Sequence, residues 1–294
     1  GAYVSDASAG PEPAEADLAQ LTYAYRAIPY GTGEVDGAGA CTEDMYIPYD
    51  AANPFGLADI KEAANDIASR GYDSGYWWLY KHLMYEDERN KTNARVKVGA
   101  AYHDVQILGL RQDKLSTPTD GRTYAGLTFG WRDIYEIKQL HTSSDTSGGW
   151  AAASLSTYLQ STFFSALGSG LRDASTGIVE VEKRQQPYNS HVLQQTREKV
   201  FSPSMFEVYG LPFSNFNADE KGPDCFQYQS FALFEGQDGY NDLAIKQSNG
   251  VNTHWWVRSA RVNGEGKFGT VHTDGTRSAN WANATGGVVP CFAL

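Results

Sequence analysis

Residues 254–294 constrain the fold more than any other segment of this chain. They read HWWVRSARVNGEGKFGTVHTDGTRSANWANATGGVVPCFAL. Asp274 and Gly275 form a tight-turn pair, which predicts a hairpin between residues 268–273 and those that follow. Residues 287–292 are typical of a short apolar closing strand, and Pro290 places that strand near a sheet edge or a bulge.

An aromatic pair beside an arginine opens this segment. We expect Trp255, Trp256 and Arg258 to be structural, with indole rings in the core and the guanidinium paired to a buried acceptor. Asp274, Gly275 and Pro290 complete the predicted structural set.

Two stretches between these landmarks, residues 260–267 and 276–285, are rich in polar, small and aromatic residues. Such a mixture contributes little to a core, but on a rigid scaffold it is typical of a binding surface. The alternative is that these side chains are merely solvated, or that Trp281 is a lid on the core. The candidate ligand-binding residues are Arg261, Asn263, Lys267, His272, Arg277, Asn280, Trp281 and Asn283.

Hydrophobic periodicity predicts the other elements. Helical spacing indicates helices over residues 57–69 and 151–167. Strand patterns indicate two strands around a turn within 96–110, a strand at 127–129 and a strand at 178–183. The aromatic stretch 76–85 precedes a charged segment, 86–95, which we interpret as an exposed loop or an insertion.

Composition excludes several classes of protein. The formal net charge of −11 argues against a nucleic-acid partner, because phosphate binding requires clustered Lys and Arg. No run of 18 apolar residues is present, so we expect no membrane insertion. The three cysteines, Cys41, Cys225 and Cys291, are far apart and odd in number, which leaves their disulfide state open.

Four landmarks follow one another in a fixed order. They are VQILGLRQDKLS at 105–116, GGWAAASLSTYL at 148–159, EKVFSPSMFEVYG at 198–210, and residues 254–294. From about residue 55 onward this set resembles the C-type-lectin-like domains of phage tail and virion proteins and of bacterial surface proteins. Two positions depart from that pattern: Val257 replaces a leucine and Val289 replaces an arginine.

The resemblance implies an α+β, C-type-lectin-like fold with two helices, a small twisted antiparallel sheet and long irregular loops. It implies an accessory or assembly segment at 1–54 and a ligand-binding domain at 55–294. The expected function is non-catalytic recognition of a host-cell surface protein or glycan, in a virion or at a cell surface. The expected assemblies are a homotrimer or contacts with other virion subunits, and a purely structural virion subunit is the first alternative.

Some relatives in this group are diversified by retroelements that rewrite adenine-rich codons. Asn263, Asn280 and Asn283 are compatible with such codons.

An enzyme is the second alternative, because formylglycine-generating enzymes share the broad fold and use reactive cysteines with copper. Cys225 and Cys291 are the candidates, and we expect Cys291 to behave as a small buried hydrophobe. Acidic residues at 219–220 and 238–242 supply oxygen atoms that calcium prefers, but such loops are usually solvated. We therefore predict no catalytic residue, no metal and no cofactor.

Overall fold

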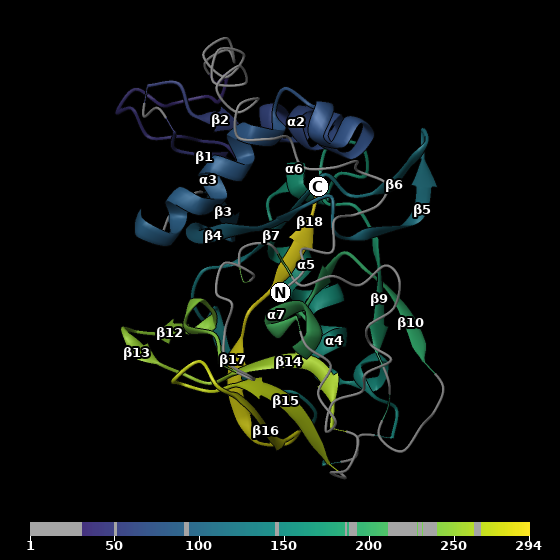
Figure 1. Cartoon of the computed structure of the whole chain (residues 1–294). Coiled ribbons are helices and arrows are strands. Elements are labelled where there is room, and N and C mark those ends of the chain that lie inside the picture. The colour runs from purple at the N-terminus through teal and green to yellow at the C-terminus, as the bar shows by residue number, and fades with distance from the viewer. Residues whose placement is uncertain are drawn as a thin grey trace.

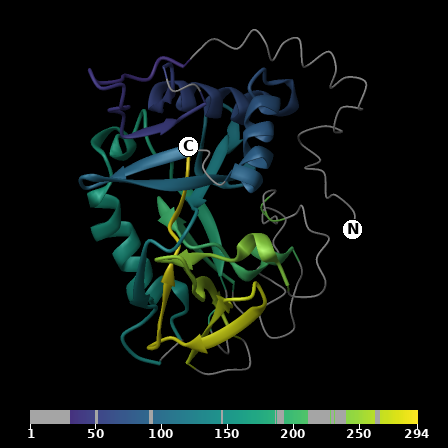
Figure 2. The ribbon, with the colours of Figure 1, turned by 90° about the vertical axis from the view of Figure 1, so that its left-hand side faces the viewer.

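The computed structural model describes residues 31–49, 52–90, 94–144, 147–185, 187, 193–210, 228, 231, 240–261 and 266–294. Two large sheets occupy different parts of the molecule, one in the upper and one in the lower half of Figure 1. Two smaller sheets flank them, and helices cover the upper sheet and fill the space beside the lower one (Figures 1 and 2).

The larger sheet has seven strands in the order β11-β18-β7-β4-β3-β1-β2, and all its pairs are antiparallel. Its strands are β1 (Met45–Ile47), β2 (Phe55–Gly56), β3 (Ala94–Val98), β4 (Ala101–Leu110), β7 (Leu127–Trp131), β11 (Val200–Phe201) and β18 (Cys291–Ala293). The predicted strands within 96–110 and at 127–129 are confirmed. Strand β1 belongs to this sheet, while the predicted domain boundary at residue 54 stays a prediction.

The second sheet has five strands in the order β16-β15-β14-β17-β8. They are β8 (Glu136–Gln139), β14 (Trp255–Ala260), β15 (Lys267–Val271), β16 (Arg277–Trp281) and β17 (Thr285–Val288). The β14–β17 pair is parallel and the others are antiparallel. The hairpin predicted around Asp274 and Gly275 is confirmed, with Gly275 at a φ of 82°.

Two small sheets complete the strand structure of the described residues. One orders β10-β9-β5-β6, with β5 (Lys114–Thr119), β6 (Arg122–Tyr124), β9 (Val181–Gln185) and β10 (Gln194–Glu198). The other pairs β12 (Gln247–Ser248) with β13 (Val251–Asn252). Strand β9 begins three residues after the predicted start at Ile178, and its buried and half-buried positions alternate as the sequence pattern predicts.

Helix α2 confirms the first predicted helix. It spans Leu57–Arg70, and the Asp59 carboxylate accepts the Gly56 N–H at 2.9 Å at its start. The other helical segments are η1 (Gly71–Asp73), α3 (Trp77–Asn90), η2 (Trp150–Ala152), α4 (Ser154–Tyr158), η3 (Leu159–Phe163), α5 (Phe164–Ala166), α6 (Ser169–Arg172), α7 (Met205–Tyr209) and η5 (Asp242–Ala244). The second predicted helix, 151–167, is thus a series of short segments in which η3 is a π-helical turn.

The interpretation of residues 86–95 as an exposed loop is wrong, because helix α3 continues to Asn90. Its start has a buried stripe, since Trp77, Tyr80 and Met84 are each at most 2% exposed. Large aromatic residues on both sides of this stripe hide the helical period from a reading of the sequence.

The predicted C-type-lectin-like architecture is also wrong. The described residues form four sheets, two of them large, and more than two helices. The prediction failed because strands of two to six residues lie within a Gly-, Asn- and Ser-rich sequence that reads as irregular loops. Only tertiary pairing makes these strands recognisable.

The two large sheets are joined by the closing segment of the chain. Strand β17 ends at Val288 in the lower sheet, and β18 begins at Cys291 in the upper sheet, between the edge strand β11 and β7 (Figure 1). The predicted closing strand is therefore two strands in two sheets. Pro290 lies between them, and its carbonyl accepts the Trp131 N–H at 3.0 Å.

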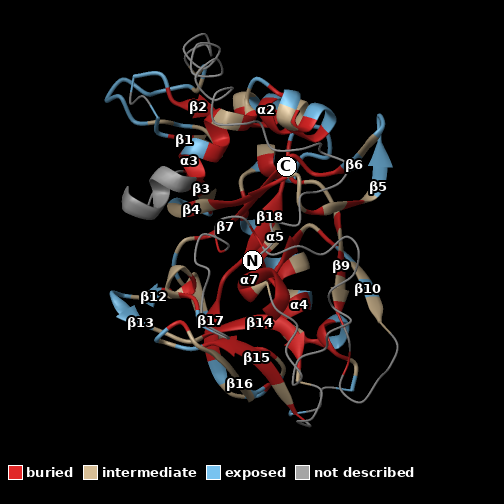
Figure 3. Cartoon of the chain, viewed as in Figure 1, coloured by how far each residue is buried: buried red, intermediate tan, exposed pale blue. Residues whose placement is uncertain are grey.

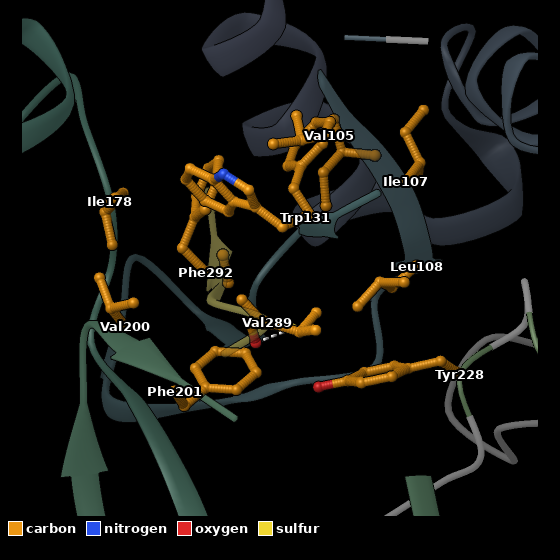
Figure 4. Close-up of a cluster of buried hydrophobic side chains, with 14 of the residues drawn as sticks. Val105, Ile107, Leu108, Trp131, Ile178, Val200, Phe201, Tyr228, Val289 and Phe292 are labelled. Atoms are coloured by element: carbon orange, nitrogen blue, oxygen red, sulfur yellow. Dashed lines mark hydrogen bonds between the residues drawn. The ribbon is translucent and has the colours of Figure 1, made fainter. Parts of the chain in front are cut away.

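The core lies where this segment crosses between the sheets. Phe292 stacks on Phe129 at 5.5 Å between ring centroids and meets Trp131 edge-on at 6.1 Å. Phe201 and Tyr228 close the same cluster from below (Figure 4). The burial of apolar side chains in such a core is the main favourable contribution to the stability of a folded protein.

Candidate ligand-binding surface

The five-stranded sheet changes from a fully buried centre to an exposed edge. Every residue of β14 is buried, whereas β16 is half-buried along its length and exposed at Trp281 (Figure 3). Strand β14 therefore fixes the backbone, and β16 presents side chains toward solvent at the edge of the sheet.

The two adjacent tryptophans of β14 are both fully buried. Trp255 donates its indole N–H to the Ala244 carbonyl at 2.8 Å, and Trp256 donates to the Lys138 carbonyl at 3.0 Å. The Trp256 ring passes over Gly286, where a Cβ would lie 2.8 Å from the indole nitrogen. A glycine is required at that position because the ring occupies the space of a side chain.

Arg258 belongs to a buried ionic cluster. Its guanidinium binds both carboxylate oxygens of Glu207, with the second contact at 3.0 Å. Lys183 contacts Glu207 at 3.1 Å and also binds Asp113, and the Tyr228 hydroxyl joins them. The two cations lower the pKa of Glu207 to about 2, although burial opposes this.

None of these five side chains is more than 5% exposed, so a ligand from solvent does not reach them. Buried charges that are fully paired in this way fix the relative positions of the elements that carry them. The cluster joins β9, α7 and β14 and has a structural role. This is the role that the sequence predicts for Arg258.

The turn at one end of the β15–β16 hairpin carries two of the candidate ligand-binding residues. Asp274 accepts the Thr276 hydroxyl at 2.6 Å and the Thr276 N–H at 3.0 Å, and it lies 3.1 Å from the exposed His272 ring. These hydrogen bonds lower the pKa of Asp274 to about 2. Arg277 begins β16 at this same end, opposite Val271.

The opposite end of the hairpin carries Trp281, which is 50% exposed. Its ring lies against Gly266, where a Cβ would come within 2.8 Å of it, and the Lys267 ammonium lies 4.8 Å from the ring centroid. Asn280 fixes the local backbone, since its side-chain oxygen accepts the Trp281 N–H at 2.9 Å. Trp281 is therefore an exposed ring held in place rather than a lid on the core.

The candidate residues thus divide between two ends of one hairpin. Arg277 and Trp281 are the first and last residues of the five-residue strand β16, and four residue steps along a strand correspond to about 13 Å. Arg261 lies at the Trp281 end, where its N–H donates to the Lys267 carbonyl at 3.0 Å. Asn283 is exposed at this end, and Asn263 lies outside the described residues.

A pocket of about 280 Å³ lies beside the Trp281 end. It is lined by Lys138, Gln139, His141, Thr142, Ser154, Leu155 and Tyr158. Two hydrogen bonds tie it to the turn after β16. The Gln139 amide donates to the Asn283 carbonyl at 2.6 Å, and the His141 N–H donates to the Ala282 carbonyl at 2.9 Å.

We call Trp281, Lys267, Asn283 and these pocket residues the Trp281 surface. The pocket residues of this surface could not be predicted from the sequence, because β8 and α4 are far from the hairpin in the chain. A signal was present: residues 141–149 read HTSSDTSGG, a polar run at the end of a strand.

Lys138 is the cation of the pocket, and its charge is already partnered. Its ammonium lies 3.4 Å from a Glu136 oxygen and 4.3 Å from the centroid of the Tyr158 ring. Burial, followed by the hydrogen bond to Glu136, raises the pKa of Tyr158, so the phenol stays neutral. The remaining polar lining consists of amide, hydroxyl and imidazole groups.

The features considered for catalysis and metal binding lie elsewhere. Cys291 is fully buried and burial raises its pKa to about 12, which keeps the thiol protonated. Asn241 uses its side chain to bind the backbone at Leu243, Val208 and Phe231. The described residues contain no group of three His, Cys, Asp or Glu side chains placed to hold a metal ion. Cys225 and the acidic pair 219–220 lie outside the described residues.

A family model described as "Domain of unknown function (DUF6273)" matches residues 126–294, which is more than half of the chain. The chain belongs to the DUF6273 family. The DUF6273 region contains the whole five-stranded sheet and every residue of the Trp281 surface. Strands β1 to β6 and helices α2 and α3 precede it.

No curated protein and no solved structure is similar enough to the chain to register as a match. Among the described residues, no helix is both long enough and apolar enough to cross a membrane. The resemblance to virion and bacterial surface proteins stays a prediction.

Proposed function

We propose that this DUF6273 protein is a non-catalytic binding protein that recognises its ligand through the Trp281 surface. The observation that carries the proposal is a half-exposed tryptophan, held by Gly266 and Lys267 and followed directly by a turn that hydrogen-bonds to residues of a polar pocket. Exposed tryptophans in fixed positions are enriched among residues that dominate binding energy.

The scaffold around this surface supports the same function. The strands that carry it, β14 and β15, are almost entirely buried and pair with each other, so the side chains at the edge are attached to a fixed backbone before a ligand arrives. Preorganisation of this kind lowers the entropic cost of binding. We further propose a setting in a virion or at a cell surface, with a component of the host-cell surface as the partner.

Binding of the labelled chain to a panel of intact bacterial cells tests this function. We expect the double variant W281A/K267A to bind at least about thirtyfold more weakly than the wild type, as for a residue that dominates an interface. Its Tm should stay within about 2 °C of the wild type, because both side chains are at the surface.

Tyr49→Ala is the matched control, because Tyr49 is also an exposed aromatic residue, 55% exposed and outside the DUF6273 region. Its binding should equal that of the wild type. Equal binding by W281A/K267A and wild type, or binding of the wild-type chain to none of the cells, would contradict the proposal.

A further inference from the structure

The polar groups of the Trp281 surface define the chemistry of its ligand. Gln139, Thr142 and Ser154 supply an amide and two hydroxyl groups, and His141 supplies an imidazole. Amide and hydroxyl groups both donate and accept hydrogen bonds without a formal charge, and one N–H of the Gln139 amide already donates to the Asn283 carbonyl. The lysine of the pocket is partnered by Glu136, so a ligand anion would compete with an existing ion pair.

The apolar groups of the surface are aromatic rings. Tyr158 lines the pocket, and Trp281, with half of its surface in solvent, directly precedes the turn that hydrogen-bonds to Gln139 and His141. Ligands that combine a flat apolar face with a ring of hydroxyl groups match this arrangement, and a sugar ring has both. Its C–H face packs on an indole or phenol ring while its hydroxyl groups bond to amides and hydroxyls.

The dimensions favour a small unit over a peptide. A volume of about 280 Å³ lies just below the range of roughly 300–1,000 Å³ typical of sites for drug-sized ligands. The links from Gln139 to Asn283 and from His141 to Ala282 place the pocket next to the turn that follows Trp281. One ring in the pocket and a neighbouring ring against Trp281 would use both halves of the surface.

A local irregularity of the backbone directly follows the helix that lines the pocket. Helix α4 ends at Tyr158 and is followed directly by the π-helical turn η3. Such turns occur often at functional sites. Here the turn also places Gln160, whose side chain bonds to the backbone of Lys199 and Val200, so the pocket wall is fixed to β11.

We propose that the Trp281 surface binds a neutral glycan, with one sugar ring in the pocket and Trp281 as a stacking platform. This inference rests on the proposed function, because it names the ligand class of the same surface.

The test uses the full chain and an immobilised panel of neutral, sialylated and sulfated oligosaccharides. We expect neutral oligosaccharides to bind, W281A to weaken that binding about tenfold or more, and W281F to retain most of it, since a phenyl ring still stacks. His141→Ala should weaken binding as a pocket variant, and Tyr49→Ala should not.

A second arm uses cells to which the chain binds, treated either with periodate, which cleaves the diols of sugars, or with protease. Loss of binding after periodate and not after protease is the expected result. Loss after protease alone, with W281A still defective, would overturn the glycan inference and leave the proposed function standing.

Two panel results would also overturn the inference. Binding confined to sialylated or sulfated oligosaccharides would indicate an anion site around Lys267. Binding of neutral oligosaccharides that W281A leaves unchanged would place the glycan elsewhere, and the proposed function would then depend on the cell experiment with W281A/K267A.

Discussion

The carboxyl group of Glu198 is buried in the core, and its two oxygens differ in their hydrogen bonding. One oxygen accepts the Trp150 indole N–H at 2.8 Å and the Thr196 hydroxyl, while the other meets no donor among the described residues. Burial therefore raises the pKa of Glu198 above its ordinary value of 4.5. A carboxyl group of this kind takes up a proton on folding, so its contribution to stability is complete below pH 4.5 and is lost as the pH rises through the folded pKa.

We predict that Glu198→Gln removes this pH dependence. The amide oxygen can still accept from Trp150 and Thr196, and the side chain no longer has to ionise. Urea unfolding between pH 4 and pH 8 should show that the wild type loses stability relative to the variant as the pH rises. If the free energies of unfolding of the two proteins changed in parallel with pH, the raised pKa of Glu198 would be contradicted.

The contribution of Glu207 to stability has the opposite pH dependence. Because the pKa of Glu207 is lowered to about 2, its contribution is complete above pH 4.5 and is lost as the pH falls toward 2. We predict that Glu207→Gln costs about 3–5 kcal/mol at pH 7, since it leaves Arg258 and Lys183 with too little negative charge in the core.

The exposed pair of Arg95 and Asp104, 3.1 Å apart, is the control for this second prediction. Asp104→Asn should cost less than about 1 kcal/mol, because solvent screens the pair. Equal costs for the two variants in urea unfolding would show that the buried cluster contributes no more than a surface ion pair.

The β15–β16 hairpin depends on the glycine in its turn. Gly275 has a φ of 82°, and a Cβ there would lie 2.5 Å from the Asn241 carbonyl oxygen. Gly250, in the turn of the β12–β13 hairpin, has a similar φ of 78° but open space around it. The two positions share the backbone strain and differ in the clash.

We predict that Gly250→Ala costs about 1 kcal/mol and Gly275→Ala clearly more, because only the second adds a collision with fixed backbone. Thermal unfolding of both variants measures the difference. Similar losses would mean that the loop at Asn241 moves away without cost.

Elements with strong local signals could be predicted from the sequence. Helix α2 has a regular apolar stripe, and the Asp274–Gly275 turn specifies its hairpin without reference to the rest of the chain. Helix α3, strand β8 and the π-helical turn depend on partners distant in the sequence. The pocket therefore could not be predicted, since it forms only when β8 and α4 meet the end of β16.

At the scale of the whole molecule, the step from β17 to β18 makes the two large sheets interdependent. Phe292, on β18, is fully buried between β7 and β11 and contacts Phe129 and Trp131. This division between two sheets could not be predicted from the sequence. Residues 287–292 have the pattern of one strand, and no local signal shows that Pro290 separates two strands.

We predict that Phe292→Ala costs about 3–5 kcal/mol and weakens both sheets together. Hydrogen exchange should show faster exchange in β14 of the five-stranded sheet as well as in β7 beside the substitution. Loss of protection confined to β7 would show that the sheets unfold separately.

The uneven exposure of the tryptophans has a practical consequence. The chain has seven, of which Trp77, Trp131, Trp150, Trp255 and Trp256 are at most 2% exposed and Trp78 is partly buried, whereas half of Trp281 faces solvent. Collisional quenchers such as iodide would therefore extinguish the emission of one indole before the others, and the ammonium of Lys267 would draw the anion toward it. Protection of Trp281 from the quencher would then report ligand binding at the Trp281 surface in the unlabelled wild-type chain.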